Sequence, residues 1–417
     1  MIKDLFDKIT TSNTSLGQYA DQEGYYIFPK LEGELGGRMK FNGKEVIVWS
    51  VNNYLGLGNH PEVRKIDTEA TEQYGLAYPM GSRMLTGNSD QHEHLERELA
   101  EFLGKESCVL VNFGYQGIMS SINSLLDKRG RDVVVYDSEC HACIVDGIWM
   151  SPGHRYKFKH NDMESLEKNL QRATKKAAET GGGILVISEG VFGMLGDQGL
   201  LKEIVAMKEN YNFRLLVDDA HGFGTLGATG AGAGEEQGCQ DGIDVYFGTF
   251  AKSMASIGGF LAGDKKIIQY LRYTMRSQIF AKTLPMPIVI GNIKRLEMLR
   301  SMPELKAKLW ENVNALQSGL KARGFDIGKT NTCVTPVFMH GSVDEAAQLV
   351  YDIRETHRIF CSIVVYPVIP KGLLLLRLIP SAAHTMQDIE DTLDAFTAVG
   401  EKLKNGVYRD AKEKIVA

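Results

Sequence analysis

Short apolar runs rich in branched residues recur along much of the chain, and longer helix-like stretches separate several of them. The runs cover Cys108–Asn112, Asp132–Tyr136, Gly183–Ser188, Phe213–Val217 and Val245–Thr249. Two helix-like stretches between them are Met163–Thr180 and Leu201–Asn210. Strands that are apolar on both faces and alternate with helices predict an α/β fold with a mostly parallel sheet. Ligands of such sheets bind beyond the carboxyl ends of the strands.

The pattern changes after about Pro285. Pro303–Arg323 predicts a long amphipathic helix, because apolar residues recur on one stripe of it: Leu305, Leu309, Val313, Leu316 and Leu320. Two strand candidates, Thr335–Met339 and Leu373–Ile379, then flank a helix around Val343–Arg358. The first residues resemble a helical arm. We therefore predict an N-terminal arm at 1–45, a large domain at 46–285 and a small C-terminal α+β domain at 286–417.

The length of 417 residues exceeds one ordinary core, which supports two domains. With 43% hydrophobic residues and a net charge of −5, the composition shows no basic excess that would indicate a nucleic-acid partner. No apolar run is long enough for a transmembrane segment, and the charged N-terminus lacks the apolar core of a signal peptide. Six scattered cysteines do not form a disulfide framework, so we expect a cytoplasmic protein.

Two motifs point to other chemistries. Cys140 and Cys143 form a C-x-x-C pair around His141, which could serve redox or zinc chemistry, but no second ligand pair accompanies them and we predict no metal site. The segment Gly222–Gly227 matches G-x-G-x-x-G after a strand. The residues that follow are too rich in glycine to open the helix that a dinucleotide site requires. We therefore assign no nicotinamide or flavin cofactor.

The strongest chemical signal is Leu215–Gly222, an apolar strand that ends in Asp218 and Asp219. Lys252 follows a second apolar strand, in the sequence Thr-Phe-Ala-Lys-Ser. An enzyme that uses pyridoxal 5'-phosphate (PLP) needs a lysine for a Schiff base and a carboxylate that keeps the pyridine nitrogen protonated. A simpler interpretation is that the aspartates and the lysine are ordinary solvated surface residues. The occurrence of both acids and the lysine directly after apolar strands disfavours this interpretation.

With other motifs, these segments make the chain similar to the α-oxoamine synthases, a PLP family that includes serine palmitoyltransferase and aminooxononanoate synthase. The motifs, in chain order, are Val51–Leu57, Gly81–Asn88, His92–Glu96, Asp137–Ala142, Asp218–Gly224, Gly248–Ser253, Gly258–Gly263 and Arg377–Thr385. The resemblance implies PLP fold type I, like aspartate aminotransferase: a large domain with a mostly parallel seven-stranded sheet and a smaller C-terminal domain. It also implies a homodimer with active sites at the subunit interface.

The resemblance implies a role for each of four catalytic residues. Lys252 would hold PLP covalently, and Asp219 would pair with the pyridinium nitrogen. His221 would bond the phenolic oxygen, and His141 would stack on the ring. The cofactor phosphate would lie at a helix N-terminus, where backbone N–H groups favour an anion. The contacts implied for this phosphate are Gly114, Tyr115 and Thr249, with Thr283 contributed by the neighbouring subunit.

The resemblance also implies that Arg377 grips the substrate carboxylate, with Asn52 nearby. Departures from the family pattern bear on the substrate. Cys143 stands where members usually have serine, and the loop Phe280–Pro285 carries Lys282 at a position that is normally small and neutral. Because this loop reaches the neighbouring subunit's cofactor in the family, Lys282 would bring a cation towards the active site. Arg83 could supply a second cation.

The implied reaction is a decarboxylative Claisen condensation of a small amino acid with a long-chain acyl thioester, carried by CoA or acyl carrier protein. It gives a 3-keto long-chain base. Cysteate carries a sulfonate where serine has a hydroxyl, so Lys282 favours cysteate, as in sulfonolipid synthesis. Serine, as in sphingolipid synthesis, stays the alternative, ahead of glycine C-acetyltransferase or aminooxononanoate synthase activity. The presence of Lys252 and the histidines disfavours an aminotransferase, a non-catalytic partner subunit and a carrier-binding module.

Overall fold

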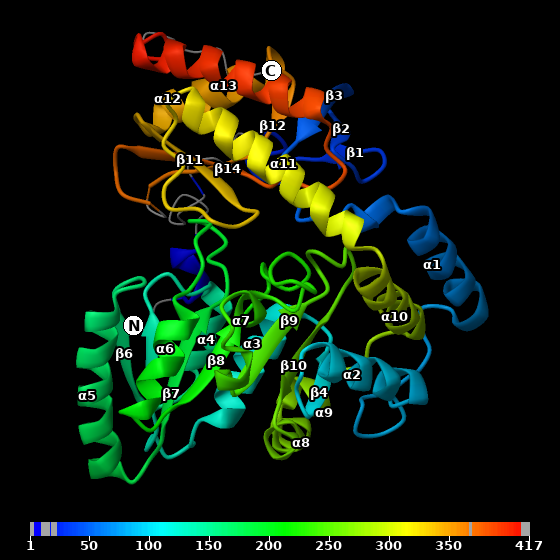
Figure 1. The fold of residues 1–417 in the computed structure, drawn as a ribbon, viewed down its shortest axis with the longest axis vertical. Helices are drawn as coiled ribbons and strands as arrows, with labels where there is room; N and C mark the ends of the chain where they lie inside the picture. The colour runs from blue at the N-terminus through cyan, green and yellow to red at the C-terminus, as the bar shows by residue number, and fades with distance from the viewer. Residues whose placement is uncertain (1–3, 10–16, 18–22, 367–368, 410–417) are drawn as a thin grey trace.

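The computed structural model describes residues 4–9, 17, 23–366 and 369–409 (Figure 1). Its central sheet contains β4 (Ser107–Val111), β5 (Val133–Asp137), β6 (His154–Phe158), β7 (Ile184–Glu189), β8 (Arg214–Asp218), β9 (Val245–Thr249) and β10 (Gly259–Gly263). The strand order is β4-β10-β9-β8-β7-β5-β6. β10 runs antiparallel to both of its neighbours, β4 and β9, and the other pairs among these strands are parallel. The predicted seven-stranded, mostly parallel sheet is confirmed.

Helices cover both faces of this sheet. One face packs under α2 (Asp90–Phe102), α5 (Met163–Thr180), α6 (Leu201–Ala206) and α10 (Met286–Ser301). The other packs under α3 (Gly114–Leu125), α4 (Ala142–Trp149) and α8 (Lys265–Thr274). Successive strand residues point to opposite faces, so Leu215 and Val217 of β8 enter the first core and Leu216 the second. The remaining helices of this part are α1 (Pro61–Tyr74), which packs on α10, α7 (Ala233–Glu236) and α9 (Arg276–Ile279).

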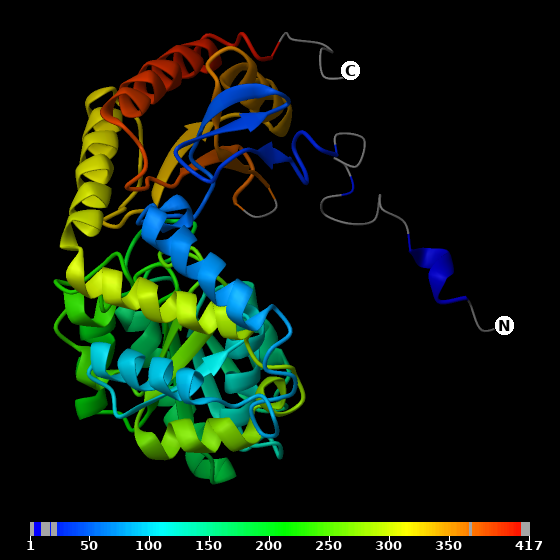
Figure 2. The same ribbon diagram turned by 90° about the vertical axis from the view of Figure 1, so that its right-hand side faces the viewer.

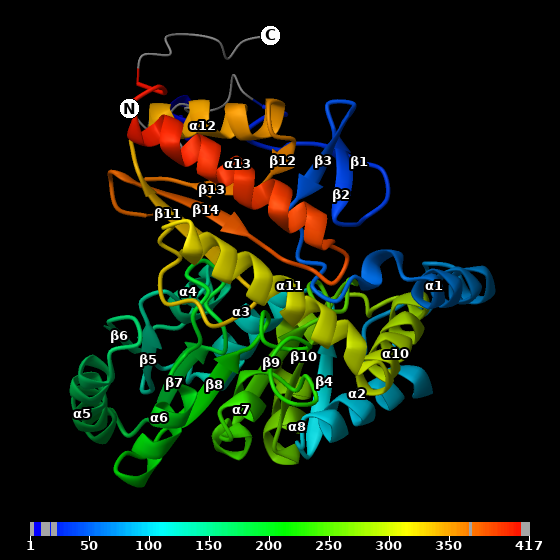
Figure 3. The same cartoon turned by 45° about the horizontal axis from the view of Figure 1, so that its top comes forward.

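The C-terminal part contains α11 (Pro303–Ala322), α12 (Val343–Glu355) and α13 (Met386–Lys404) around an antiparallel sheet. That sheet has the order β11 (Thr335–His340), β14 (Leu373–Leu378) and β13 (Ser362–Val364). Helix α11 lies between the two parts (Figure 3). Its residues Leu309 and Val313 enter the large core, whereas Leu316 and Leu320 enter the small one. The apolar stripe of this helix, seen in the sequence, thus packs into the hydrophobic cores of both parts.

The N-terminal region differs from the expected helical arm. Three strands, β1 (Leu31–Glu32), β2 (Arg38–Phe41) and β3 (Lys44–Val48), form a sheet with β12 (Ile359–Phe360) of the C-terminal part (Figure 2). The turn between β2 and β3 is Asn42-Gly43, and both residues have positive φ, of 50° and 72°. An Asn-Gly turn of this kind favours a hairpin. The helical expectation is therefore wrong for residues 31–48, while the division into three domains stays a prediction.

Candidate active site

A cavity of about 450 Å³ opens where the carboxyl ends of β5, β7, β8 and β9 meet. The predicted site residues that line it are Asn52, Gly114, Tyr115, His141, His221, Thr249, Lys252 and Arg377. They come from distant parts of the chain, and the parallel sheet brings them to one edge. This edge is where α/β sheets of this kind bind ligands.

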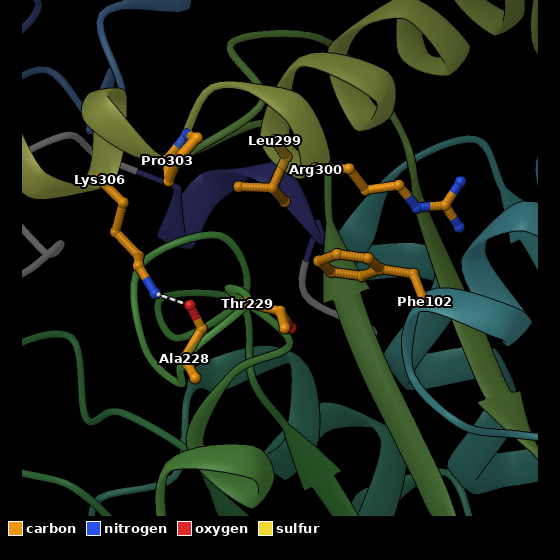
Figure 4. A pocket seen from close by; sticks show the side chains of 7 residues that line it. All are labelled: Phe102, Ala228, Thr229, Leu299, Arg300, Pro303 and Lys306. Atoms are coloured by element: carbon orange, nitrogen blue, oxygen red, sulfur yellow. Dashed lines mark hydrogen bonds between the residues drawn. The ribbon is translucent and has the colours of Figure 1, made fainter.

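A second hollow, of about 320 Å³, lies between the ends of α2 and α10 and the start of α11 (Figure 4). Both cations that line it are already engaged by the protein. Lys306 Nζ donates to the carbonyl oxygen of Ala228 at 2.7 Å, and Arg300 pairs with Glu98. No carboxylate or histidine is among the described residues that line it. The cavity at the sheet edge is therefore the better candidate for chemistry.

Lys252 lies after β9, and two buried carboxylates, Asp218 and Glu189, lie near its amine. Burial lowers the pKa of Lys252, although both carboxylates oppose the shift. Burial, followed by the charge of Asp218, raises the pKa of Glu189 well above its usual range. The neutral form of an amine is the nucleophile, so a lysine with a lowered pKa suits Schiff-base chemistry.

The structure favours a different acidic residue as the partner of the cofactor ring. Asp219, the residue predicted to face the cofactor ring, does not line the cavity. Its Oδ2 accepts hydrogen bonds from the Ala233 N–H at 2.8 Å and the Tyr246 hydroxyl at 2.9 Å, both part of the core on the opposite face of the sheet. Asp218 lines the cavity instead. Strand alternation explains the difference, because Asp218 shares the face of Leu216 and Asp219 takes the other face.

The His221 ring is held by a hydrogen bond with Tyr54, whose hydroxyl lies 2.6 Å from His221 Nδ1. Burial lowers the pKa of His221 well below its usual range, and the charges of Lys252 and Arg377 add to the shift. The imidazole is therefore neutral at neutral pH. With the Tyr54 hydroxyl donating to Nδ1, the ring proton stays on Nε2. A Cβ on Gly193 would lie 2.3 Å from His221 Nε2, so the close approach of the backbone at 193 to this ring requires glycine.

His141 stands at the start of α4, and its own helix sets the orientation of its ring. Its Nδ1 accepts a hydrogen bond from the Cys143 N–H at 3.3 Å, and Cys143 Sγ lies 3.0 Å from the same nitrogen. The backbone N–H of His141 donates to Glu189 Oε1 at 2.5 Å. Because Nδ1 is an acceptor, the neutral ring carries its proton on Nε2 and can donate to a substrate.

The start of α3 forms the anion-binding end of the cavity. Its N-cap residue, Phe113, provides no side-chain cap for the first N–H groups of the helix. Gly114 and Tyr115 both line the cavity here. A Cβ on Gly114 would lie 3.5 Å from Thr249 Oγ1, so the hydroxyl of Thr249 is close to the same N–H groups. Backbone donors at a helix N-terminus suit a phosphate, and the Thr249 hydroxyl, which here donates to the Gly258 carbonyl oxygen at 3.0 Å, lies beside them.

Arg377 on β14 reaches the opposite wall of the cavity. Its Nη1 donates to the Gly193 carbonyl oxygen at 2.9 Å and lies 3.6 Å from Met194 Sδ. Its buried Nε has no hydrogen-bond partner among the described residues, and neither has Oδ1 of Asn52. Buried polar atoms usually have partners, so the unpaired donor of Arg377 indicates a ligand anion.

These groups fit PLP and an amino-acid substrate. The ring nitrogen needs a buried carboxylate, which Asp218 provides, and the reactive carbon needs an amine, which Lys252 provides. His221 can donate to the phenolic oxygen, the start of α3 suits the phosphate, and Arg377 suits a carboxylate. Each of these protein groups has a charge or a hydrogen-bonding capacity that the protein leaves unused or only partly used.

Besides Asp219, three more predicted residues do not line the cavity of their own chain. Arg83 is buried and its guanidinium pairs with Glu96 through two hydrogen bonds, of 2.8 and 3.1 Å, so a role in binding a sulfonate stays a prediction. Thr283 is buried, and its hydroxyl bonds with His92 Nε2 at 3.1 Å. Lys282 is exposed, and its Nζ donates to the carbonyl oxygen of Leu76 at 3.2 Å.

Sequence reasoning missed several residues of the cavity, among them Glu189 and the segment Phe192–Leu195. Glu189 ends β7, an apolar strand that was already recognised, so the rule that ligands bind at strand ends could have identified it. Phe192–Leu195 carries no polar signature in the sequence. Tyr54 lies within a quoted motif, but its contact with His221 joins residues too far apart in the chain to be inferred from spacing.

Known proteins are similar to most of this chain. Residues 44–396 match the family model for aminotransferase class I and II. The chain is 63% identical to the cysteate-C-fatty acyltransferase of Capnocytophaga ochracea over 98% of this chain and 97% of that protein. It is 37% identical to the 8-amino-7-oxononanoate synthase of Thermoanaerobacter pseudethanolicus over 89% of this chain and 92% of that protein.

A solved structure is also similar over nearly the whole chain. It is a variant of the serine palmitoyltransferase from S. paucimobilis with a bound adduct of PLP and myriocin. The TM-score is 0.87 at 30% sequence identity, and the match covers 97% of this chain and 100% of that one.

Proposed function

Because the chain belongs to the aminotransferase class I and II family, we propose that it is a PLP-dependent acyltransferase that condenses cysteate with a long-chain acyl thioester. In this reaction a C–C bond forms between the amino-acid α-carbon and the acyl carbonyl carbon, and the thioester C–S bond breaks. The α-carboxylate leaves as CO₂, and a proton takes its place. The product is a 3-keto long-chain base that keeps the sulfonate.

The identity of 63% with the Capnocytophaga ochracea enzyme carries this proposal. It extends over 98% of this chain and 97% of that protein, so the similarity is not confined to one part of the chain. The similarity to the aminooxononanoate synthase and to the serine palmitoyltransferase, at 37% and 30% identity, supports the same cofactor and reaction class. At these lower identities, the similarity supports the amino-acid substrates of those two enzymes less strongly for this chain.

Serine is the second candidate substrate, and one observation favours it. Among the described residues of one chain, the lysine and arginine side chains that line the cavity are Lys252 and Arg377. Lys252 is committed to the cofactor and Arg377 to the substrate carboxylate. No other lysine or arginine among the described lining residues is then left for a sulfonate, so we expect cysteate recognition to use a residue from outside this cavity.

Lys282 of a second subunit is our candidate for that residue. The carbonyl oxygen of Lys282 accepts a hydrogen bond from Asn112 Nδ2, which places its loop beside the exposed Phe113 and the start of α3. Large hydrophobic side chains are exposed in the single chain on this loop (Phe280), on the segment that bonds to it (Leu76, Met80 and Leu85), and at Phe113 and Tyr273. Such a surface suits a homodimer interface, across which the exposed Lys282 would reach the partner's cavity.

The residues of the cavity have distinct tasks in the reaction. Bound PLP supplies a protonated ring that stabilises negative charge at the substrate α-carbon. Asp218 holds the proton on the ring nitrogen, and Arg377 orients the amino acid through its carboxylate. Lys252 Nζ removes the α-proton, which its lowered pKa favours at neutral pH. His141 donates from Nε2 to the oxygen of the acyl carbonyl as negative charge develops there.

The test is a substrate competition with the purified, PLP-loaded protein and a long-chain acyl-CoA. Cysteate and serine are offered at equal concentration, and the two keto products are separated by mass. We expect the sulfonated product to dominate, with release of one CO₂ and one thiol per product. Exclusive formation of the serine product would replace cysteate by serine, and no product with either amino acid would refute the proposed reaction. Repeating the assay with acyl carrier protein identifies the carrier.

A cytoplasmic location is part of the proposal. All six cysteines are free and buried in the structure, which suits a reducing compartment. No helix in the described residues combines the length and the apolar composition needed to cross a bilayer.

A further inference from the structure

His160 lies outside the cavity and bridges two carboxylates. Its Nδ1 lies 3.0 Å from Asp137 Oδ1, and its Nε2 lies 2.9 Å from Asp197 Oδ2. The Asp137 side chain is fully buried, and 15% of the Asp197 side chain and 20% of the His160 side chain are exposed. We call these three residues the clamp. Asp137 begins the motif Asp137–Ala142, but the mechanism above uses none of the three residues.

The clamp holds a positive charge between two negative ones. An ionised carboxylate only accepts hydrogen bonds, so both ring nitrogens of His160 must donate, and the ring is an imidazolium. Although burial opposes this charge, the hydrogen bonds to Asp137 and Asp197 raise the pKa of His160 to about 10. Asn161 adds neutral hydrogen bonds to both acids, from its N–H to Asp137 and from Nδ2 to Asp197.

Each acid of the clamp belongs to a segment that lines the cavity. Asp137 ends β5, and its Oδ1 also accepts the Glu139 N–H at 2.9 Å, at the start of the loop that leads to His141. Asp197 closes a tight turn, because the Phe192 N–H donates to its carbonyl oxygen at 3.0 Å. The ring of His160 packs edge-on against Phe192, with centroids 4.4 Å apart.

The turn connects the clamp to Arg377. It carries Gly193 and Met194, whose carbonyl oxygen and sulfur contact the Arg377 guanidinium. At its tip, Gly196 has a φ of 74°, and its carbonyl oxygen accepts from the hydroxyls of Thr330 and Thr332 of the C-terminal part, each at 2.8 Å. The turn is thus held by the clamp on one side and by the C-terminal part on the other.

We propose that His160 is a positioning residue, which locks the loop carrying His141 to the turn that orients Arg377. This inference deepens the proposed function, on which it rests. Groups that act on a substrate must be held to within a fraction of an ångström, and a charged bridge between two loops does this more firmly than neutral hydrogen bonds. Without it, the Arg377 end of the cavity should loosen while the acyl donor still binds.

The experiment compares His160→Gln with His94→Gln in the full-length protein. His94 is a matched control, because it is another histidine beside a carboxylate, Glu98, with a side chain that is 42% exposed and lies outside the cavity. Asp197→Asn is a second, near-isosteric test variant that removes one charge of the clamp. The first measurement is amide hydrogen exchange without substrate. We expect peptides that cover 137–143 and 190–199 to exchange at least about fivefold faster in both test variants and to be unchanged in the control.

The second measurement is steady-state kinetics with each substrate varied in turn. We expect the KM for the amino acid to rise about tenfold in His160→Gln, with less than about a twofold change in the KM for the acyl thioester. Equal exchange in all variants, or a lowered Tm with an unchanged amino-acid KM, would overturn the positioning role. If the wild type turns over neither cysteate nor serine, the proposed function fails, and the exchange data alone decide the role of the clamp.

Discussion

The cavity and the clamp lie at the same edge of the central sheet, yet they treat buried charge in opposite ways. In the cavity, burial shifts the pKa values of Lys252 and Glu189 towards the neutral forms. In the clamp, two hydrogen-bonded carboxylates shift the pKa of His160 towards the charged form. The cavity also leaves the Nε of Arg377 without a protein partner, whereas both ring nitrogens of His160 are satisfied.

We infer from this difference that the cavity groups take part in the reaction, whereas the clamp holds other residues in position. A proton carrier or nucleophile must be able to change its protonation state near neutral pH, so its charge is only partly compensated. A positioning group works best when its charge is fully paired and its geometry cannot change. Variants in the two regions should therefore fail in different ways.

The largest effect is expected for Lys252→Ala. Without the amine, turnover should fall by about 10³-fold or more, because the base and the covalent anchor are lost together. Borohydride reduction of the wild type followed by peptide mapping should label Lys252 with the cofactor. Label on a different lysine would remove Lys252 from its role, whatever the activity of the variant.

The next effect distinguishes two neighbouring acids. Asp218→Asn should lower kcat by about 10²-fold, because a neutral partner no longer holds the ring proton. Asp219→Asn is the matched control on the other face of the sheet. Its amide oxygen can still accept from Ala233 and Tyr246, so we expect less than about a fivefold change in kcat. Comparable losses in the two variants would contradict the assignment of Asp218 to the ring nitrogen.

A smaller effect is expected for Lys282→Ala. The kcat/KM for cysteate should fall about tenfold and that for serine less than twofold, because only the sulfonate gains a charge-assisted hydrogen bond. Mixed dimers sharpen the test. If Lys282 acts across the interface, a Lys282→Ala subunit paired with a Lys252→Ala subunit should form one site that lacks both residues and one intact site. An equal loss for both amino acids would contradict a role of Lys282 in recognising the sulfonate.

The smallest effect is the pH dependence of the clamp. The pKa of His160 is raised to about 10 from an unfolded value of about 6.5, so its stabilisation is fully present below about pH 6.5 and is lost as pH rises through 10. The groups that face it are Asp137 and Asp197. The Tm of the wild type should exceed that of His160→Gln by several degrees at pH 6.5, and this gap should narrow by pH 10. A gap that stays constant or widens would mean that His160 is not charged.

Much of the fold follows from local patterns. The strand Val245–Thr249 and the helix Met163–Thr180 match their predicted bounds, because apolar runs and helical periodicity are properties of short segments. The N-terminal hairpin was open to the same reasoning through Asn42-Gly43, but its pairing with β12 joins residues at opposite ends of the chain. Local patterns carry no information on such pairing.

The sequence by itself determined the class of sheet, the edge at which a ligand binds, and the lysine, histidines and arginine that gather there. It could do so because each of these residues follows a recognisable apolar strand or belongs to an ordered motif. Only the tertiary structure decided between Asp218 and Asp219, since Leu215, Leu216 and Val217 are all apolar and the pattern does not say which face meets the cavity. Only the structure showed that Arg83 forms an ion pair with Glu96, and that His160 joins two loops through Asp137 and Asp197. In each case the decisive contact is between side chains whose separation in the chain is set by folding, which no local period encodes.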